Sequence, residues 1–374
     1  MAGSFRLDSG AMSRPLTFYE FFAGGGMARL GLGSAWRCLF ANDFDPVKVS
    51  TYRANFGDED IHEGDVWKLS PDDLPGQADL AWASSPCQDF SLAGARAGLT
   101  GGRSSAFFGF WRLIEALNAE SRAPRTIVIE NVIGLLTSHG GKDFEALCRA
   151  LAKEGYSFGA LEIDAAHFTP QSRPRVFVVA SREPRAGLTG DSPFHTPAVR
   201  AAYERLPAEL KGLWRWWPVA APPTRNTDLA AILEDGAVWR SSEDTDHLLS
   251  LMSPAHRARL ADGSVGAVFR RTRADGQRAE VRTDGLAGCL RTPRGGSSRQ
   301  TIVVAENGKV RSRLLTPREG ARLMGLPETY QLPRLATAAL HVVGDGVAVP
   351  VVRWLAEHLL EPLLRDAAPA IAAE

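Results

Sequence analysis

Four side chains in three separate segments have the types needed for nucleophilic chemistry. Cys87 follows the apolar stretch LAWASS, Glu130 follows RTIVI, and Arg173 and Arg175 precede VFVVA. A thiol, a carboxyl group and guanidiniums at one crevice would form a nucleophile with an acid and an electrostatic clamp. The arginines would also favour the thiolate, the reactive form of cysteine. Each residue alone fits a structural role, but their joint occurrence at matching strand ends predicts a catalytic site.

A glycine-rich turn predicts a nucleotide-type cofactor site. The segment FFAGGG, residues 21–26, ends one apolar segment and opens a helical one. Glycine there lets a ligand approach the backbone, and a helix N-terminus favours an anion. Asp43 follows about 20 residues later, after the next apolar segment, where a carboxylate would bind a ribose diol.

The residues near this turn favour an adenosyl cofactor over NAD. The dinucleotide fingerprint requires a third glycine at the position of Arg29. Phe44 could stack on a purine ring, and Asp65 and Val66 could contact the adenine edge. No metal is expected, because the four cysteines are widely spaced without a CxxC pair and the zinc-deaminase motifs are missing.

The order of apolar segments predicts the scaffold that positions these groups. Strands that alternate with helices at this spacing are typical of an α/β protein with a mostly parallel, doubly wound sheet. In such a sheet the functional loops gather at the carboxyl ends of the strands. Strands are expected at 16–22, 37–41, 78–85, 125–132 and 173–181, with helices from Met27 and at 105–120 and 142–156.

Composition indicates two domains. Residues 16–185 are expected to form the catalytic and cofactor-binding domain. Residues 181–290 are rich in Pro, Arg and Trp with weak periodicity, and 186–337 are expected to form a smaller, mixed, loop-rich domain. The aromatic segment LWRWW, 213–217, is interpreted as the core of that small domain.

The last third of the chain contains a recognisable helix start and an amphipathic tail. Thr316 is a good N-cap, and Pro317 fits the first helical position. The segment 338–366 is expected to form a helix that returns to the catalytic domain. Residues 1–15 are expected to be a disordered leader, and 367–374 a tail.

Charge and composition place the chain in a broad class. Of 374 residues, 43 are basic and 43 acidic, so the net charge gives no sign of a nucleic-acid partner. The spacing of the cysteines excludes a disulfide framework, and neither a signal peptide nor an apolar run long enough to span a bilayer is expected. These features favour a cytoplasmic protein with no membrane partner.

One window of the expected small domain is nevertheless strongly basic. Residues 251–300 hold ten arginines and four acids, a net charge of +6, and no lysine. Arginine suits bidentate contacts with phosphate or guanine, and the composition of RTPRGGSSRQ lets the backbone approach phosphates. The candidate DNA contacts in this segment are Arg291, Arg294, Ser297 and Arg299.

Taken in order, the motifs resemble those of bacterial DNA (cytosine-5) methyltransferases. The resemblance covers 16–180 and about 286–360, while 181–285 corresponds to the variable target-recognition domain of the family. It implies a Rossmann-like S-adenosylmethionine-dependent fold. The motifs that carry it are FFAGGG, PCQDFSLAG, ENV, PQSRPR, RLLTPREGARLMGLP and GDGVAVP.

The resemblance implies a mechanism for the four reactive side chains. Cys87 would add to C6 of a cytosine rotated out of duplex DNA, and C5 would then accept the methyl group of S-adenosylmethionine. Glu130 would hydrogen-bond N3 and the exocyclic amine, Arg175 would bind O2, and Arg173 would support the site. The product would be S-adenosylhomocysteine.

The resemblance also implies a cofactor site and contacts beside the nucleophile. Gln88 would orient the loop around the cysteine, and Ser91 could contact a phosphate. Asp345 replaces the usual asparagine, and could pair with the ammonium group of the cofactor or repel its carboxylate. The residues expected to line the cofactor site are Glu20, which replaces the usual aspartate, Phe22, Ala23, Gly24, Gly26, Asp43, Phe44, Asp65, Val66, Pro86, Asp345 and Gly346.

Three alternatives stay open at this stage. A tRNA cytosine-5 methyltransferase would share the same motifs, and a silent DNA-binding protein would share the fold. A nucleotide-dependent oxidoreductase is disfavoured by Arg29. The favoured interpretation is a monomeric enzyme that acts on double-stranded DNA, in restriction-modification or in epigenetic marking. Whether a cognate restriction endonuclease acts on the same site stays open.

Overall fold

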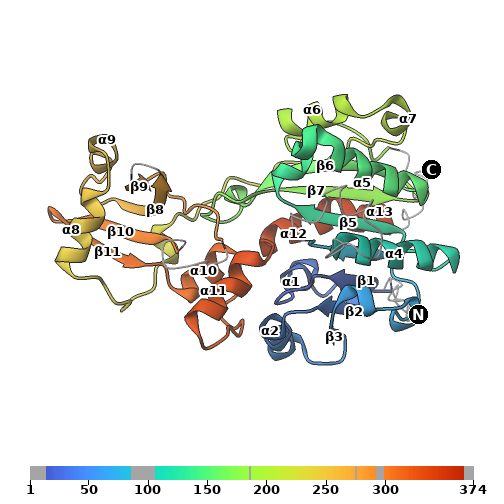
Figure 1. Cartoon of the computed structure of the whole chain (residues 1–374), viewed down its shortest axis with the longest axis horizontal. Helices are drawn as coiled ribbons and strands as arrows, with labels where there is room; N and C mark the ends of the chain where they lie inside the picture. The colour runs from blue at the N-terminus through green and yellow to red at the C-terminus, as the bar shows by residue number, and fades with distance from the viewer. Residues whose placement is uncertain (1–13, 86–105, 185–186, 274–275, 292–298, 366–374) are drawn as a thin grey trace, which may run out of the picture.

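The structure is a computed structural model that describes residues 14–85, 106–184, 187–273, 276–291 and 299–365. Figure 1 shows a large part built on a seven-stranded sheet and a smaller part built on a four-stranded sheet. The polypeptide leaves the large part in a yellow-green segment and returns to it in the red segment near the C-terminus (Figure 1).

The large sheet has the order β3-β2-β1-β4-β5-β7-β6. The first five strands in this order are parallel, whereas β7 is antiparallel to both of its neighbours. This confirms the expected mostly parallel α/β sheet. The strands are β1 Leu16–Phe21, β2 Trp36–Asp43, β3 Ile61–Glu63, β4 Leu80–Ala83, β5 Thr126–Asn131, β6 Ser157–Asp164 and β7 Pro174–Ser181.

Helices cover both faces of the large sheet, which explains why β1, β4 and β5 are buried along their whole lengths. One face packs against α1 and the C-terminal helices, and the other against α4 and α5. The helices of the large part are α1 Met27–Leu32, α2 Pro46–Phe56, α4 Ala106–Ala119, α5 Lys142–Lys153, α6 Pro197–Arg205, α7 Ala208–Lys211, α12 Val349–Leu355 and α13 Glu361–Leu364.

Strand β6 was not expected from the sequence, and it determines the direction of β7. Only nine residues, 165–173, join the two strands. A parallel crossover needs about a dozen residues or more, so this short connection produces an antiparallel pair. As a result, the start of β7 lies at the same edge as the carboxyl end of β5, with Glu130 opposite Phe177 and Asn131 opposite Val176.

The interpretation of 213–217 as the core of the small domain is wrong. Trp214 forms a β-bridge with Phe158 of β6 and an edge-on ring contact with the same residue. The indole Nε1 of Trp217 donates to the Val179 carbonyl of β7 at 3.1 Å. These aromatic residues therefore extend the core of the large sheet, because the edge strand β6 offers them apolar surface and a backbone partner.

The smaller sheet is entirely antiparallel, with the order β11-β10-β8-β9. Its own core joins Val268 of β8 and Val303 of β10 to Leu248 and Met252. The elements are β8 Val265–Arg273, β9 Gly276–Arg282, β10 Thr301–Glu306, β11 Lys309–Leu314, α8 Ser242–Ser250 and α9 Pro254–Arg257.

The predicted helix start at Thr316 is confirmed. The Thr316 hydroxyl accepts from the Glu319 amide at 3.1 Å, the Glu319 carboxylate accepts from the Thr316 amide, and Pro317 begins α10 Pro317–Leu323. Helix α11 Ala336–Asp345 follows. Both lie where the two parts of the molecule meet (Figure 1).

The C-terminal helices pack against the first helix of the large part. By length and composition, the helical stretch Ala336–Leu364 could cross a membrane, which corrects the expectation that no run was long and apolar enough. However, 56% of its most apolar window is buried inside the molecule. Its α12 packs directly on α1, where a Cβ on Gly31 would lie 2.5 Å from Val352 Cβ. This helical stretch therefore has the burial of a core element.

The beginning and the end of the large part meet at one ionic cluster. Asp79 lies just before β4 and accepts two hydrogen bonds of 2.9 Å from the Arg14 guanidinium. Arg125 Nη1 lies 3.6 Å from the same carboxylate, and also donates to the Leu364 carbonyl of α13 at 3.1 Å. This cluster therefore joins residues that are 350 positions apart.

Candidate active site

The structure brings Glu130 and Arg175 together at the edge formed by the ends of β5 and β7. Arg175 Nε lies 3.2 Å from Glu130 Oε1, and the two side chains are 15% and 8% exposed. A carboxyl group and a guanidinium in this arrangement can hold a planar polar ring by several hydrogen bonds. The antiparallel direction of β7 makes this meeting possible.

The segment that leads to the predicted nucleophile starts beside this pair. Asn131, directly after Glu130, donates from Nδ2 to the Ser85 carbonyl at 3.1 Å. The Ser84 amide donates to the Phe21 carbonyl at 3.3 Å, so this segment is fixed on both sides. Cys87 itself lies outside the described residues, as do Pro86, Gln88 and Ser91.

Two of the remaining cysteines are poor nucleophiles. Cys38 and Cys148 are buried. Burial, followed by the nearby Glu20 carboxylate, raises the pKa of Cys38 to about 12, and burial also raises the pKa of Cys148. Because the thiolate is the reactive form, neither thiol is suited to attack a substrate at neutral pH.

Cys289 is a thiol near the site that the sequence analysis did not single out. It is partly exposed, and its Sγ accepts from Arg173 Nη1 at 3.4 Å. The two terminal nitrogens of Arg175 lie 3.8 and 3.9 Å from the same sulfur. No local motif marks this residue, because the contact is formed across the fold.

Arg173 differs from Arg175 in its surroundings. It is only 2% exposed, and burial, followed by the charge of Arg175, lowers its pKa to about 10. Its guanidinium donates to the carbonyls of Leu290 at 3.0 Å, Gly344 at 2.9 Å and Gly346 at 2.6 Å. Arg173 thus joins β7 to two distant segments.

Gln171 reinforces this junction and was also missed. It is fully buried, its Oε1 accepts from the Leu290 amide at 3.0 Å, and its Nε2 donates to the Leu323 carbonyl of α10 at 2.9 Å. Its only signal in the sequence is its place in PQSRPR. The junction fixes the segment where the chain returns from the small domain.

On the predicted cofactor side, Glu20 is buried with an unsatisfied oxygen. It is 1% exposed, and its Oε1 accepts from the Arg29 amide at 3.4 Å. Among the described residues, Glu20 Oε2 has no hydrogen-bond partner. Burial raises the pKa of Glu20 to about 8, despite the opposing effect of Arg29. A buried polar atom without a partner is costly, so this oxygen is suited to a ligand.

The glycine turn next to Glu20 opens on free space. Gly24 has a φ of +56°, and a Cβ there would meet nothing within 4 Å. Its amide donates to Asp43 Oδ2 at 2.8 Å, and Asp43 Oδ1 accepts from the Asp45 amide at 2.9 Å. Burial raises the pKa of Asp43. Phe44, the next residue, exposes 70% of its surface.

The other predicted cofactor residues differ in exposure. Ala23 is buried and Phe22 is half-buried with a φ of 57°. Asp65 accepts from the Trp67 amide at 3.0 Å and so caps a short 3₁₀ turn. Val66 packs its side chain into the core, with 4% exposed. A Cβ on Gly26 would lie 2.4 Å from the Phe56 ring, so only glycine fits there.

Asp345 is paired within the protein. Its Oδ2 lies 2.8 Å from the Nζ atom of Lys48, a residue in the first turn of α2. The next residue, Gly346, is a close-approach position, because a Cβ there would lie 2.2 Å from Met27 Sδ. Lys48 was not predicted, since nothing in its local sequence marks it.

Of the predicted DNA contacts, Arg291 is exposed and Arg299 is partly buried, whereas Arg294 and Ser297 lie outside the described residues. Arg299 donates from Nη2 to the Leu315 carbonyl at 3.0 Å.

Within the described ranges, no group of three His, Cys, Asp or Glu side chains could hold a metal ion.

Comparison with known proteins identifies the family. Residues 16–361 match the model of the C-5 cytosine-specific DNA methylases. The chain belongs to this family. Type II methyltransferase M1.ScrFI of Lactococcus lactis subsp. cremoris is 30% identical over 349 residues, which cover 92% of this chain and 78% of that protein. Type II methyltransferase M.HhaI of Haemophilus parahaemolyticus is 27% identical over 347 residues, which cover 92% and 94%.

Solved structures support the same fold. The crystal structure of S. pombe Dnmt2 methyltransferase superposes with a TM-score of 0.66 at 18% identity, covering 93% of this chain and 99% of that one. The family, the fold and the activity predicted from the sequence are thus confirmed. The methylase is a DNA (cytosine-5) methyltransferase, and its family implies S-adenosylmethionine as the methyl donor.

Proposed function

We propose that the methyltransferase acts on a cytosine flipped out of duplex DNA, through a covalent bond between Cys87 Sγ and cytosine C6. The observation that carries this proposal is the 3.2 Å pair of Glu130 and Arg175. Ser85, two residues before Cys87, is tied to Asn131 beside that pair. This proximity supports a single pocket in which all three side chains contact one base.

In this pocket each side chain would have a separate task. The Cys87 thiolate adds to C6, and the electron pair of the C5–C6 double bond moves toward C5. Glu130 hydrogen-bonds N3 and the exocyclic amine, and Arg175 hydrogen-bonds O2, so both stabilise the charge that develops on the ring. C5 would take the methyl group from the sulfonium of the cofactor, which would leave as S-adenosylhomocysteine. A base then removes the C5 proton, and the C6–S bond breaks to restore the thiolate.

The residues around the glycine turn fit an adenosyl cofactor, which supplies an electrophilic methyl group on its sulfonium. We propose that Asp43 binds the ribose hydroxyls and that the exposed Phe44 ring stacks on the adenine. The free space at Gly24 and the unpaired oxygen of Glu20 support a polar ligand at this turn. Arg173 is proposed as a positioning residue, because its contacts are with the carbonyls of the protein backbone.

Transfer of tritium from labelled S-adenosylmethionine to mixed-sequence duplex DNA tests the proposal. We expect labelling by the wild type and none by Cys87→Ser, which should still bind S-adenosylhomocysteine with wild-type affinity. A duplex that carries 5-fluorocytosine should trap an adduct with the wild type alone. Equal labelling by the variant would refute the role of Cys87.

The Type II relatives support a partner proposal. We propose that the natural substrate is a short duplex sequence, protected against a cognate endonuclease that acts on the same site. Bisulfite sequencing of a methylated genomic library would reveal one recurring motif. A parallel reaction with tRNA should stay unlabelled, and preferential labelling of tRNA would favour the RNA alternative instead.

A further inference from the structure

We propose that a pocket of the small domain, between α8 and β8, binds one phosphodiester group of the DNA substrate. The pocket has a volume of about 300 Å³ and is lined by Arg240, Asp244, His247, Leu248, Leu251 and Arg270. The inference rests on the proposed function, because it assigns the ligand to the DNA of that reaction. It adds a binding site far from the reactive residues at the end of β5.

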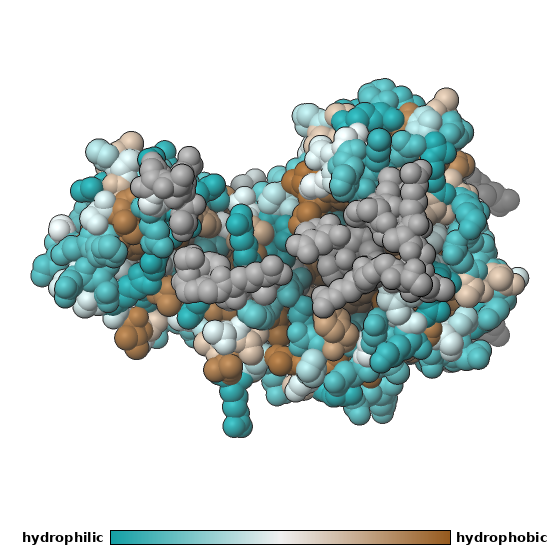
Figure 2. Space-filling model, viewed as in Figure 1, coloured by the Kyte–Doolittle hydropathy of each residue, from teal (hydrophilic) through white to brown (hydrophobic). Residues whose placement is uncertain are grey.

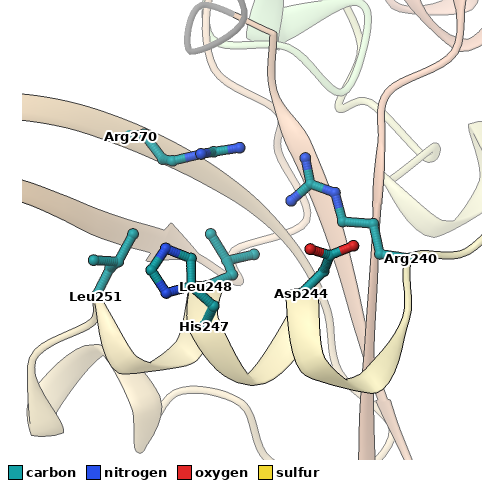
Figure 3. A pocket seen from close by; sticks show the side chains of 6 residues that line it. All are labelled: Arg240, Asp244, His247, Leu248, Leu251 and Arg270. Carbon is teal, nitrogen blue, oxygen red and sulfur yellow. The ribbon is translucent and has the colours of Figure 1, made fainter.

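The geometry of the pocket suits an anion with several oxygens. Figure 3 shows the guanidinium groups of Arg240 and Arg270 directed toward the same opening from two sides, above Asp244 and His247. Arg240 directly precedes Ser241, the N-cap of α8, and Arg270 comes from β8. Two guanidiniums that converge from separate elements can contact a tetrahedral phosphate from two sides. The edge of a base, by contrast, is planar and is contacted from one side only.

The arginines of this pocket lack the ion pairs that neutralise their neighbours. Arg271 pairs with Glu280 at 3.1 Å, Arg282 pairs with Asp284 at 2.6 Å, and Arg313 pairs with Glu319. By contrast, within the described ranges no carboxylate forms an ion pair with Arg240 or Arg270. Their positive charge is therefore available to a ligand.

The charge of Arg240 is only partly compensated by its surroundings. Burial, and then the charge of Arg270, lowers the pKa of Arg240, and Arg299 contributes in the same direction. An anion in the pocket would relieve this repulsion. Asp244 offsets the repulsion only in part, and it is exposed.

The surroundings of the pocket favour DNA as the source of the anion. Arg299 belongs to RTPRGGSSRQ, the segment predicted to contact DNA, and its charge acts on Arg240. Most of the visible surface of the small domain is hydrophilic, as a wet interface with a polyanion requires (Figure 2). A phosphate of the duplex that contacts this segment could therefore reach the same pocket.

Equilibrium binding of duplex DNA across a range of KCl concentrations tests the proposal, with Arg271→Ala as the matched control. Arg271 is the next residue on β8, so its side chain projects from the opposite face of the sheet, and its removal changes the net charge equally. We expect Arg240→Ala and Arg270→Ala each to weaken binding about tenfold for specific and unrelated duplexes alike. Each should also reduce the salt slope by about 1, whereas Arg271→Ala should match the wild type.

Two outcomes would overturn the proposal. The first is binding by Arg240→Ala and Arg270→Ala that matches Arg271→Ala in affinity and slope. The second is weaker binding of the specific duplex alone, which would indicate that the pocket recognises a base. Thermal unfolding of each variant separates loss of a contact from loss of the fold. Since binding is measured without methyl transfer, failure of the proposed catalytic function would appear separately, as absence of tritium transfer by the wild type.

Discussion

Lys48 Nζ and Asp345 Oδ2 lie 2.8 Å apart, and this ion pair joins the first turn of α2 to the end of α11. Burial alone would lower the pKa of Lys48, but Asp345, together with Asp43 and Asp45, outweighs it and raises that pKa. A carboxylate where the family usually has an amide is thus neutralised within the protein. The methionine end of the cofactor, which the resemblance places near this position, would then meet a neutral pair and not an isolated carboxylate.

A double-mutant cycle should reveal the coupling between these two residues. We expect Lys48→Met to weaken the binding of S-adenosylhomocysteine several-fold, because it leaves an unpaired carboxylate close to that of the ligand. Lys48→Met combined with Asp345→Asn should recover most of the loss. Isothermal titration calorimetry would measure a coupling energy of about 1 kcal/mol. The expected value is small because Asp345 is partly exposed, so solvent weakens its interaction with Lys48. Strictly additive effects would contradict this prediction.

Glu130 and Arg175 should affect the chemical step more than cofactor binding. We expect Glu130→Gln and Arg175→Met each to lower kcat by about 10²- to 10³-fold, because each removes a group that stabilises charge on the ring. The affinity for S-adenosylhomocysteine should change little. Single-turnover methylation and calorimetry on the same samples check both statements, and a matching loss in both quantities would instead indicate a distorted fold.

Substitution of Arg173 should lower the free energy of unfolding, whereas substitution of Arg175 should lower the rate of methyl transfer. Arg173→Met would leave the buried carbonyls of Leu290, Gly344 and Gly346 without this donor, at a cost of about 3 kcal/mol or more in the free energy of unfolding. Urea unfolding should detect the loss, while Arg175→Met should stay within about 1 kcal/mol of the wild type. Equal stability of the two variants would argue against the junction.

Glu20 should make the stability of the cofactor-free protein depend on pH. Its pKa rises in the folded state from 4.5 to about 8, so the protonated form is the one that the fold favours. That stability is fully present below the unfolded pKa and is lost as pH rises toward 8, on the order of 1 kcal/mol per pH unit.

Glu20→Gln should remove this dependence and become the more stable protein at pH 8. Urea unfolding of both proteins at intervals from pH 5 to 8.5 would show the curves diverge. The exposed Glu183→Gln serves as a control and should follow the wild type throughout. Parallel curves for Glu20→Gln and the wild type would show that the carboxylate is already ionised in the fold.

Much of the site could be predicted from short segments of the sequence. Continuous apolar runs mark β4 and β5, and polar groups that follow neighbouring parallel strands share one edge, which places Glu130 beside the segment that follows β4. Arg175 precedes its apolar run, so its meeting with Glu130 depends on the antiparallel direction of β7. Strand β6 was not predicted because its apolar run is interrupted by small and acidic residues in SFGALEID. The direction of β7 depends on that missing strand.

Other features depend on contacts between distant segments, which leave no local pattern. Lys48 and Asp345 are almost 300 positions apart, and Cys289 meets Arg173 across 116 positions. The aromatic residues around Trp214 predict that this segment is buried, but not which sheet it covers. The hydrophobic effect is non-directional, so it does not select one apolar surface over another. Only the fold determines these partners.

The ionic cluster of Arg14, Asp79, Arg125 and Leu364 has a topological consequence. Arg14, just before the first strand, binds the Asp79 carboxylate, and Arg125 links that carboxylate to the Leu364 carbonyl of the last helix. The two ends of the large part therefore lie close together, and the small sheet is inserted between them. A short linker could join the two ends, and the chain could be opened elsewhere, for example at the exposed turn around Gly236, without separating any strand of the large sheet from its neighbours. The architecture is therefore suited to circular permutation.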